Sequence, residues 1–270
     1  MRFVAVELSG ARVLLTGASG GIGNAIARAL HERGAYVLIS GRRVDALEEL
    51  KASLGERVEV LQADLAKRSD VDALPGRVGD LDVLVANAGL PGSGDLDSFS
   101  AEEIDRALDV NLRAPMQLTH AVLPGMIRKG SGHVVYVSSL SGKVPAGGSS
   151  VYAATKFGLR GFGASLHDEL HGTGVGATTV FPGFISDAGM FADSGVKLPS
   201  GVGTKTPENV AAAVIAGIEK NRTEIDVAPL AVRATGKLAG LAPGAVTSMN
   251  RRFGGRSVSD GLAEAQREKR

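Results

Sequence analysis

The alternation of short apolar runs with longer helical patterns constrains the fold of this chain more than any other feature. Strands that are buried on both faces show little polar alternation, and they are typical of a parallel sheet. Helical patterns over residues 101–129, 149–171 and 207–220 fit the crossovers of such a sheet. We therefore predict an α/β fold with a doubly wound, seven-stranded parallel sheet flanked by helices on both faces. The predicted strands are residues 12–15, 35–40, 58–62, 81–86, 133–138 and 176–181, with 225–227 as a seventh.

The length of 270 residues fits one large α/β domain. We expect residues 1–227 to form this domain, with a lid at about 186–206 that is rich in Gly, Ser and Asp. Residues 228–270 form a basic C-terminal extension with eight Lys or Arg and three Asp or Glu residues. We expect this extension to fold as short helices that pack on the lid or on another subunit.

Composition argues against several classes of function. The net charge of +1 and the aromatic content of 4%, without Trp, disfavour a nucleic-acid-binding surface. The absence of cysteine excludes disulfides, thiol nucleophiles and cysteine-ligated zinc. The first 15 residues do not resemble a signal peptide, and no run of 18 apolar residues occurs. We therefore expect a cytoplasmic protein without integral membrane contact, and leave open a contact of the basic extension with an anionic membrane.

A glycine-rich turn, TGASGGIG at residues 16–23, follows the first predicted strand and opens a helix. Glycines there allow a sharp turn and let backbone N–H groups approach a pyrophosphate at the positive end of the helix. A glycine-rich turn without a ligand is the alternative. The order of strand, glycines and helix favours a dinucleotide site made by Gly17, Ser19, Gly20, Gly21, Ile22 and Gly23.

Tyr152 and Lys156 lie four residues apart in the helix predicted at 149–171, and therefore on one face of it. A free phenol has a pKa of about 10, and a neighbouring ammonium group favours the phenolate. The pair can therefore act as a general acid and base near neutral pH. A tyrosine and a lysine four residues apart also occur on solvated helix faces, so the pair alone does not indicate catalysis.

Together these motifs resemble those of the short-chain dehydrogenase/reductase family. TGASGGIG is similar to the family signature Thr-Gly-x-x-x-Gly-x-Gly. The resemblance runs from about residue 10 to 227, and it implies that 1–227 is a Rossmann-fold catalytic domain, beyond which the basic C-terminal extension is longer than the family's minimal core. It also implies a homodimer or homotetramer formed through the two long helices. The other family motifs, in chain order, are Asp64, Asn87-Ala88-Gly89, Asn111, Ser139, Tyr152, Lys156 and Pro182-Gly183.

The resemblance implies catalytic roles for four residues. Tyr152 is the general acid and base, and Lys156 lowers its pKa and binds the nicotinamide ribose. Ser139, 13 positions before Tyr152, orients the substrate oxygen. Strand alternation should turn the adjacent Ser138 to the other face. Asn111 holds a water in the proton relay to Lys156, or makes a structural hydrogen bond to the neighbouring strand, or does both.

The resemblance also implies the remaining cofactor contacts. Asp64 contacts the adenine, or instead caps the next helix. After the second strand, Gly41 replaces the acidic residue of NAD sites, and Arg42 and Arg43 follow. Guanidinium groups bind a 2′-phosphate, so NADP(H) is favoured over NAD(H), with two solvated arginines as the alternative. The other predicted contacts are Leu65, Asn87, Ala88, Gly89, Tyr152, Lys156, Pro182, Gly183 and Ile185.

Two positions depart from the family pattern. Ala86 stands where the family more often has an asparagine, and Asp187 stands where it usually has a threonine. Either Ser186 replaces that threonine, or Asp187 caps a short lid helix over residues 188–191.

The expected function is that of an NADP(H)-preferring short-chain oxidoreductase that interconverts a ketone or aldehyde and an alcohol by hydride transfer. An epimerase or dehydratase of the extended branch is disfavoured, because too few residues follow the sixth strand for its larger substrate domain. A non-catalytic NAD(P)-sensing protein is the other alternative, although it would not need Ser139, Tyr152 and Lys156 together.

The substrate and the remaining chemistry-bearing residues are less constrained by the sequence. A small-molecule carbonyl or alcohol with an apolar body is expected, because the lid region contains Phe184, Met190, Phe191, Val196 and Leu198. No metal site is expected, and His167 and His171 are interpreted as structural. Met116 and Met126 are interpreted as core residues.

Overall fold

The computed structural model describes residues 5–198, 202–252 and 255–269, and it contains one seven-stranded parallel sheet. The strand order is β3-β2-β1-β4-β5-β6-β7, so the chain winds outward in both directions from the central pair. This order and the parallel pairing confirm the predicted doubly wound sheet. The strands are β1 (Arg12–Thr16), β2 (Tyr36–Gly41), β3 (Val58–Gln62), β4 (Val83–Ala86), β5 (Gly132–Val137), β6 (Val175–Pro182) and β7 (Glu224–Val227).

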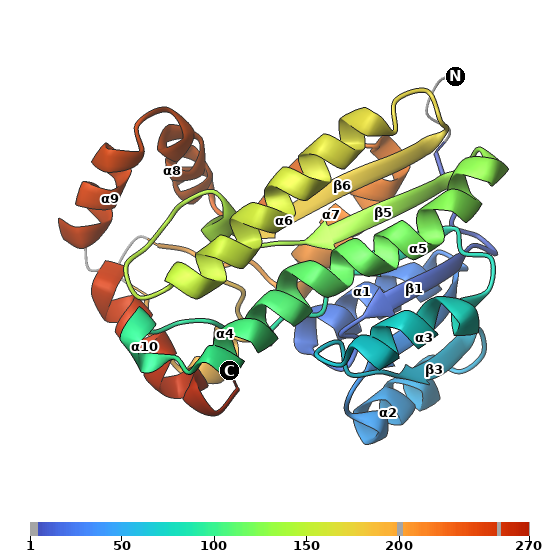
Figure 1. The fold of residues 1–270 in the computed structure, drawn as a ribbon, viewed down its shortest axis with the longest axis horizontal. Coiled ribbons are helices and arrows are strands. Elements are labelled where there is room, and N and C mark those ends of the chain that lie inside the picture. Colours follow the sequence, from blue (N-terminus) through green and yellow to red (C-terminus); the bar gives the residue numbers. More distant parts are fainter. Residues whose placement is uncertain (1–4, 199–201, 253–254, 270) are drawn as a thin grey trace.

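Helices cover both faces of the sheet (Figure 1). Helices α1 (Gly21–Glu32), α2 (Val44–Leu54) and α7 (Pro207–Lys220) lie on one face. Helices α3 (Arg68–Val78), α5 (Ala114–Lys129) and α6 (Ser150–Glu169) cover the other. No helix in the described ranges is long and apolar enough to cross a membrane.

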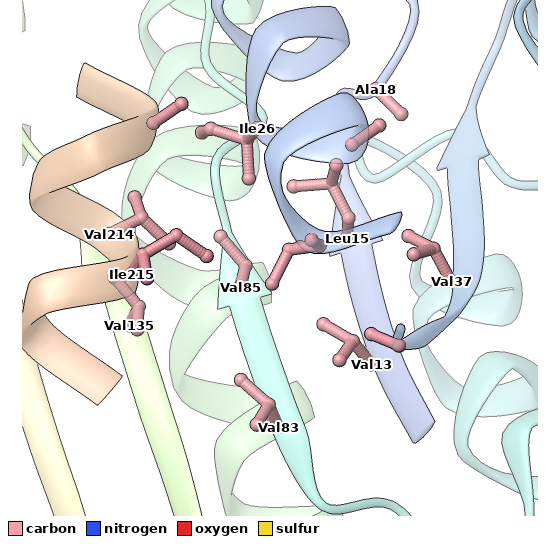
Figure 2. Close-up of a cluster of buried hydrophobic side chains, with 14 of the residues drawn as sticks. Val13, Leu15, Ala18, Ile26, Val37, Val83, Val85, Val135, Val214 and Ile215 are labelled. Carbon is pink, nitrogen blue, oxygen red and sulfur yellow. The ribbon is translucent and has the colours of Figure 1, made fainter. Parts of the chain in front are cut away.

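The core consists of two apolar layers, one on each side of the sheet. Successive side chains of a strand point to opposite faces, so Val13 and Leu15 of β1 enter one layer and Leu14 enters the other. Figure 2 shows the first layer, in which Leu15 lies between Ile26 of α1 and Val37 of β2. Burial on both faces explains why the strands lack polar alternation in the sequence.

One predicted helix is divided. The helical pattern over residues 101–129 is confirmed, but it consists of α4 (Ala101–Leu108), a π-helical segment (Asp109–Arg113) and α5. Pro115 contributes to the break, because it has no N–H to donate to the carbonyl of Asn111, four residues before it. Isolated π-helical turns within helices occur often at functional sites.

The C-terminal extension is helical, as predicted, and consists of α8 (Leu230–Leu241), α9 (Pro243–Arg252) and α10 (Gly255–Gln266). A 3₁₀ turn, Arg267–Lys269, follows α10. Figure 1 shows these helices at the left side of the view, beyond the carboxyl ends of β5 and β6. Of the predicted lid, residues 199–201 lie outside the described residues.

Of the two methionines predicted to be core residues, only one is buried. Met126 is 1% exposed and packs under β5, whereas Met116 is 38% exposed on α5. The prediction for Met116 is therefore wrong. Its α-helix carries one buried and one exposed face, and Met116 lies on the exposed one.

Candidate active site

A cavity of about 1180 Å³ lies at the carboxyl edge of the sheet, where open parallel sheets bind their ligands. The turns after β1, β2, β4, β5 and β6 all contribute to its wall. Every predicted site residue except Asn111 lines this cavity. The lining residues from the prediction are Gly17, Ser19, Gly20, Gly21, Ile22, Gly23, Arg42, Arg43, Asp64, Leu65, Asn87, Ala88, Gly89, Ser139, Tyr152, Lys156, Pro182, Gly183 and Ile185.

The glycine-rich turn fits a dinucleotide pyrophosphate. Gly17 has a φ of +69°, and a Cβ there would lie 2.7 Å from the Cα of Ala88. Gly20 at the N-cap of α1 offers no side-chain cap, and the first turn of α1 has no acidic residue. The first N–H groups of α1 can therefore bind an anion without competition from a capping side chain.

Asn87 holds this turn from the neighbouring strand end. Its Nδ2 donates to the carbonyl oxygens of Thr16 (3.0 Å) and Gly17 (3.1 Å). The Thr16 hydroxyl accepts from the backbone N–H groups of Asn87 and Ala88, both at 3.1 Å. These bonds join the ends of β1 and β4, so the motif after β4 also fixes the shape of the glycine turn.

The end of β2 fits a phosphorylated adenosine. A Cβ at Gly41 would lie 3.3 Å from the Ser19 hydroxyl oxygen, so the end of β2 packs closely on the glycine turn, and Gly41 brings no carboxylate to this place. Arg43 donates through Nη2 to the carbonyl of Ser19, and Arg42 lines the cavity. Arg42 also lines an adjoining cavity of about 390 Å³ together with Lys67, which adds a second cation. Hydroxyl and guanidinium groups are the donors that a 2′-phosphate requires.

Asp64 does not cap the next helix, so that alternative is wrong. The N-cap of α3 is Lys67, which makes no side-chain cap. Asp64 Oδ1 instead accepts from the N–H of Ala66 at 3.1 Å, while its own N–H donates to Asp70 at 2.8 Å. These bonds fix the Asp64 turn at the wall of the cavity.

Ser139 and Tyr152 are brought together by the end of β5 and the first turns of α6. Their side chains share a hydrogen bond, and the Ser139 oxygen also accepts from the Ser141 N–H at 3.1 Å. Lys156 lies one turn further along α6, with Nζ 5.5 Å from the centre of the Tyr152 ring and 3.1 Å from the Val137 carbonyl oxygen. The three predicted catalytic side chains thus converge on one wall of the cavity.

The pKa of Tyr152 is higher than the sequence predicts. Burial raises this pKa to about 12, and the hydrogen bond with Ser139 acts in the opposite direction. Burial also lowers the pKa of Lys156 to about 8. Burial therefore keeps the pKa of Tyr152 above that of a free phenol, and the predicted lowering of this pKa by Lys156 stays a prediction.

Lys156 is buried at a cost to stability, which gives a testable prediction. It is 2% exposed, and its pKa of about 8 lies below the ordinary 10.5. Below pH 8 the folded chain carries this charge at a cost of about 3 kcal/mol, and the cost falls as pH rises from about 8 to about 10.5. Lys156→Met should therefore raise the free energy of unfolding at pH 7 by about 2 kcal/mol, after a loss of about 1 kcal/mol for the bond to Val137.

Urea unfolding of both proteins at pH 7 and at pH 10.5 checks this prediction. The gain from Lys156→Met should shrink at the higher pH, because the wild-type lysine is then largely neutral. A variant that is less stable than the wild type at both pH values would contradict the account.

Asn111 lies outside the cavity wall, in the π-helical segment, and is buried. Its Oδ1 accepts from the Leu90 N–H at 2.7 Å, and its Nδ2 donates to the Leu90 carbonyl oxygen (3.0 Å) and the Thr155 hydroxyl (3.3 Å). The side chain therefore ties the segment after β4 to α6, so its structural hydrogen bonds go to a loop and a helix, and the predicted bond to the neighbouring strand is wrong. Gly89 leaves space here, since a Cβ there would lie 3.6 Å from Lys156 Nζ.

Neither proposed substitute for the family threonine lines the cavity. Asp187 has a φ of +68° and accepts at 2.9 Å from the Ser186 hydroxyl. No helix forms over residues 188–191, and the 3₁₀ turn Ala192–Ser194 has Phe191 at its N-cap. The prediction that Asp187 caps a lid helix is wrong, because its left-handed backbone turns the chain before that turn begins.

The lid itself lies close to the glycine turn. A Cβ on Gly21 would collide with the side chain of Ala188, so the lid packs directly on the first turn of α1. Of the apolar lid residues, Phe184, Met190, Phe191 and Leu198 line the cavity, whereas Val196 packs against α10. The predicted apolar wall is therefore present without Val196.

Sequence reasoning missed three kinds of site residue. Ser138 donates to the Lys156 carbonyl oxygen at 3.2 Å, so it helps to hold α6. Gly92 passes Tyr152 so closely that a Cβ there would lie 3.0 Å from Tyr152 Cβ. Residues of α10, such as Val258 and Leu262, also line the cavity. The doublet Ser138-Ser139 was a signal for the first. The prediction that the extension packs on the lid is confirmed by the bond from Gln266 to Met190, but no sequence signal placed α10 in the cavity wall.

Histidines show no metal-like arrangement within the part of the chain that is described. No group of three or more His, Cys, Asp or Glu there could hold a metal ion. His167 Nδ1 lies 2.7 Å from the carbonyl oxygen of Ala177, which is a structural contact between α6 and β6.

Comparisons with known proteins agree with this arrangement. Residues 11–197 match the short chain dehydrogenase family. The chain is 39% identical over 228 residues to the ketoacyl reductase HetN of Nostoc sp. strain PCC 7120, covering 82% of this chain and 79% of that protein. It is 36% identical over 205 residues to the NADP-dependent 3-hydroxy acid dehydrogenase YdfG of Escherichia coli K12, covering 74% of this chain and 82% of that protein. A solved structure of serine dehydrogenase complexed with NADP⁺ aligns with a TM-score of 0.74 and 32% identity, covering 82% of this chain and 95% of the other.

Proposed function

The chain belongs to the short-chain dehydrogenase family, and from this membership we propose that it is an NADP(H)-preferring oxidoreductase that interconverts a ketone or aldehyde and an alcohol. The observation that carries the proposal is the convergence of Ser139, Tyr152 and Lys156 in the same cavity as the glycine turn. A phenol that shares a hydrogen bond with a serine hydroxyl can hold a substrate oxygen and exchange a proton with it.

The proposed mechanism assigns each residue one task. NADP(H), when bound, supplies or accepts the hydride. In the reductive direction the Ser139 hydroxyl donates a hydrogen bond to the carbonyl oxygen, and Tyr152 donates its proton to that oxygen as the alcohol forms. The Lys156 ammonium stabilises the resulting phenolate, and Asn111 fixes α6 so that the pair keeps its geometry. We propose that Asn111 also helps to hold a water in the proton relay to Lys156.

The preference for NADP(H) rests on the end of β2 and on the named relatives. Gly41 carries no carboxylate that would repel a phosphate, and Ser19, Arg42 and Arg43 line the cavity beside it. YdfG is named as NADP-dependent, and the serine dehydrogenase structure holds NADP⁺. The glycine turn, Asn87 and Asp64 would hold the rest of the dinucleotide.

We also propose that the chain forms a homodimer or homotetramer through the long helices. Exposed apolar side chains gather on them, including Met116 (38%) and Ile127 (42%) of α5 and Phe157 (39%) of α6.

Met116→Asp should therefore reduce the molecular mass in solution to that of a monomer, because a carboxylate would be buried at the interface. Light scattering coupled to size-exclusion chromatography measures this mass. Leu96→Asp, at an exposed apolar residue outside the long helices, is the matched control and should leave the mass unchanged. If the Met116→Asp variant kept the wild-type oligomer, the interface would have to lie elsewhere.

Consumption of NADPH with a panel of small ketones and aldehydes tests the proposed function. Absorbance loss that depends on the carbonyl compound supports an oxidoreductase. Tight NADPH binding without any carbonyl-dependent consumption would favour the alternative, a non-catalytic NAD(P)-sensing protein.

A further inference from the structure

The C-terminal helix α10 lies outside the match to the family, which ends at residue 197, yet it forms part of the cavity wall. Val258 and Ser259 are buried there, and Leu262 lines the cavity beside them. The lid residues Met190 and Leu198 line the same cavity. Part of the cavity wall is therefore built by a segment that the family motifs do not include.

One end of α10 is attached to the loop after β4. The Arg256 guanidinium donates through both terminal nitrogens to the two carboxylate oxygens of Asp95, and its Nε lies 2.8 Å from Asp260 of the same helix. A Cβ on Gly148 would lie 3.2 Å from the Ser259 side chain, so α10 also packs on the segment before α6. The Gly94 N–H donates to the Gly148 carbonyl at 2.7 Å, which makes these two segments one rim of the cavity.

The other end of α10 is attached to the lid. Gln266 is 4% exposed, and its Nε2 donates to the Met190 carbonyl oxygen at 2.8 Å. A Cβ on Gly261 would lie 3.0 Å from Val196, so helix and lid are in van der Waals contact. Lys269, just after α10, pairs with Asp193 at 3.0 Å. The lid therefore forms a second rim of the cavity, and α10 joins it to the first rim at Gly94 and Gly148.

The two attachments differ in strength. The Arg256–Asp95 pair is about half exposed on both sides, and exposed ion pairs are weak and screened by salt. Gln266 is 4% exposed, its bond to Met190 is partly buried, and Gly261 of the same helix packs on Val196. The polar attachment at the Arg256 end is therefore the weaker one, and this end, which also packs on Gly148 through Ser259, releases more readily than the Gln266 end.

We propose that α10 is a specificity-determining wall of the substrate site, which joins the two rims and limits the size of the apolar part of the substrate. This inference rests on the proposed oxidoreductase function. The substrate class is a free carbonyl compound whose apolar body contacts Val258 and Leu262. Release of the Arg256 end widens the site for larger compounds.

Two substitutions with opposite expected effects on kcat/KM for bulky ketones test whether α10 is this wall, with the full-length enzyme and NADPH. Leu262→Trp should lower kcat/KM for a bulky aryl or long-chain ketone at least tenfold and leave kcat/KM for a four-carbon ketone within about twofold, because only the larger molecule reaches α10. Arg256→Gln should shift the ratio of the two kcat/KM values at least fivefold towards the bulky ketone. Leu230→Trp, on the exposed side of α8, is the matched control and should change neither value. Equal effects on both ketones, or none, would overturn the proposal.

A second measurement does not depend on turnover. Hydrogen exchange of the NADPH-loaded protein should show lid amides over residues 189–196 exchanging at least tenfold faster in Gln266→Ala than in the wild type. Unchanged exchange would mean that α10 does not hold the lid, and it would overturn the wall as described. If the wild type reduces no carbonyl compound but this exchange difference is found, the proposed function fails while the attachment of α10 to the lid stands.

Discussion

Tyr152→Phe should lower kcat for carbonyl reduction about 10³-fold, which is within the range of a lost general acid. The substitution removes only the hydroxyl that shares a hydrogen bond with Ser139, and it leaves the ring beside Lys156. Steady-state kinetics with a ketone reduced by the wild type measures the loss. The dissociation constant of NADPH should stay within about threefold, because the glycine turn and the arginines are untouched.

Tyr36→Phe is a matched control for this substitution. Tyr36 stands at the start of β2, where its ring stacks under Arg12, and it is not a lining residue of the cavity. The kcat of the Tyr36→Phe variant should equal that of the wild type. Retention of most of the wild-type kcat by Tyr152→Phe would contradict the assignment of the acid.

The pH dependence of Tyr152 follows from its raised pKa. With a pKa of about 12 the phenol is protonated across the neutral range, so proton donation during reduction should be insensitive to pH there. Alcohol oxidation needs the phenolate, and its rate should rise with pH as the proton is lost. The measurement is a pH profile of kcat in both directions. Reduction that varies with pH in the neutral range, or oxidation that slows as pH rises, would contradict this role.

Gly41→Asp with Arg42→Gln should shift the preference for NADPH over NADH by about 10² to 10³. One lost bond to a charged phosphate costs about 1.5–3 kcal/mol, and a carboxylate beside that phosphate adds repulsion. The new carboxylate can instead accept from a ribose 2′-hydroxyl. The backbone of Gly41 has no positive φ, so an aspartate is tolerated apart from a close approach to Ser19.

The ratio of kcat/KM values for the two cofactors measures this change. Arg33→Gln is the control, because Arg33 is an exposed arginine that pairs with Glu219 away from the cavity. A double variant that still prefers NADPH as strongly as the wild type would show that the end of β2 does not set the preference.

The sheet and its cofactor edge could be predicted because each depends on local sequence signals. Apolar runs identify strands buried on both faces, and the predicted strand ends lie within two residues of those observed. The turn at residues 16–23 needs glycines for steric reasons that a sequence displays directly, as Gly17 shows. The approach of Asn87 to that turn follows from the parallel pairing of β1 and β4.

Features that depend on tertiary contacts could not be predicted. The π-helical segment depends on how Asn111 meets Leu90 and Thr155, and the helical periodicity around it is ordinary. The pKa of Tyr152 depends on how deeply the phenol is desolvated, which residue spacing does not show. The place of α10 in the cavity wall depends on contacts of Arg256, Ser259, Gly261 and Gln266 with loops that are distant in the sequence.

Transfer of deuterium from NADPH labelled at the reactive C4 position to a ketone substrate tests the central claim most directly. The account predicts, by mass spectrometry, an alcohol with one deuterium on the former carbonyl carbon, formed by the wild type and about 10³-fold more slowly by Tyr152→Phe. An alcohol without deuterium, or equal rates of labelled product from both proteins, would contradict it.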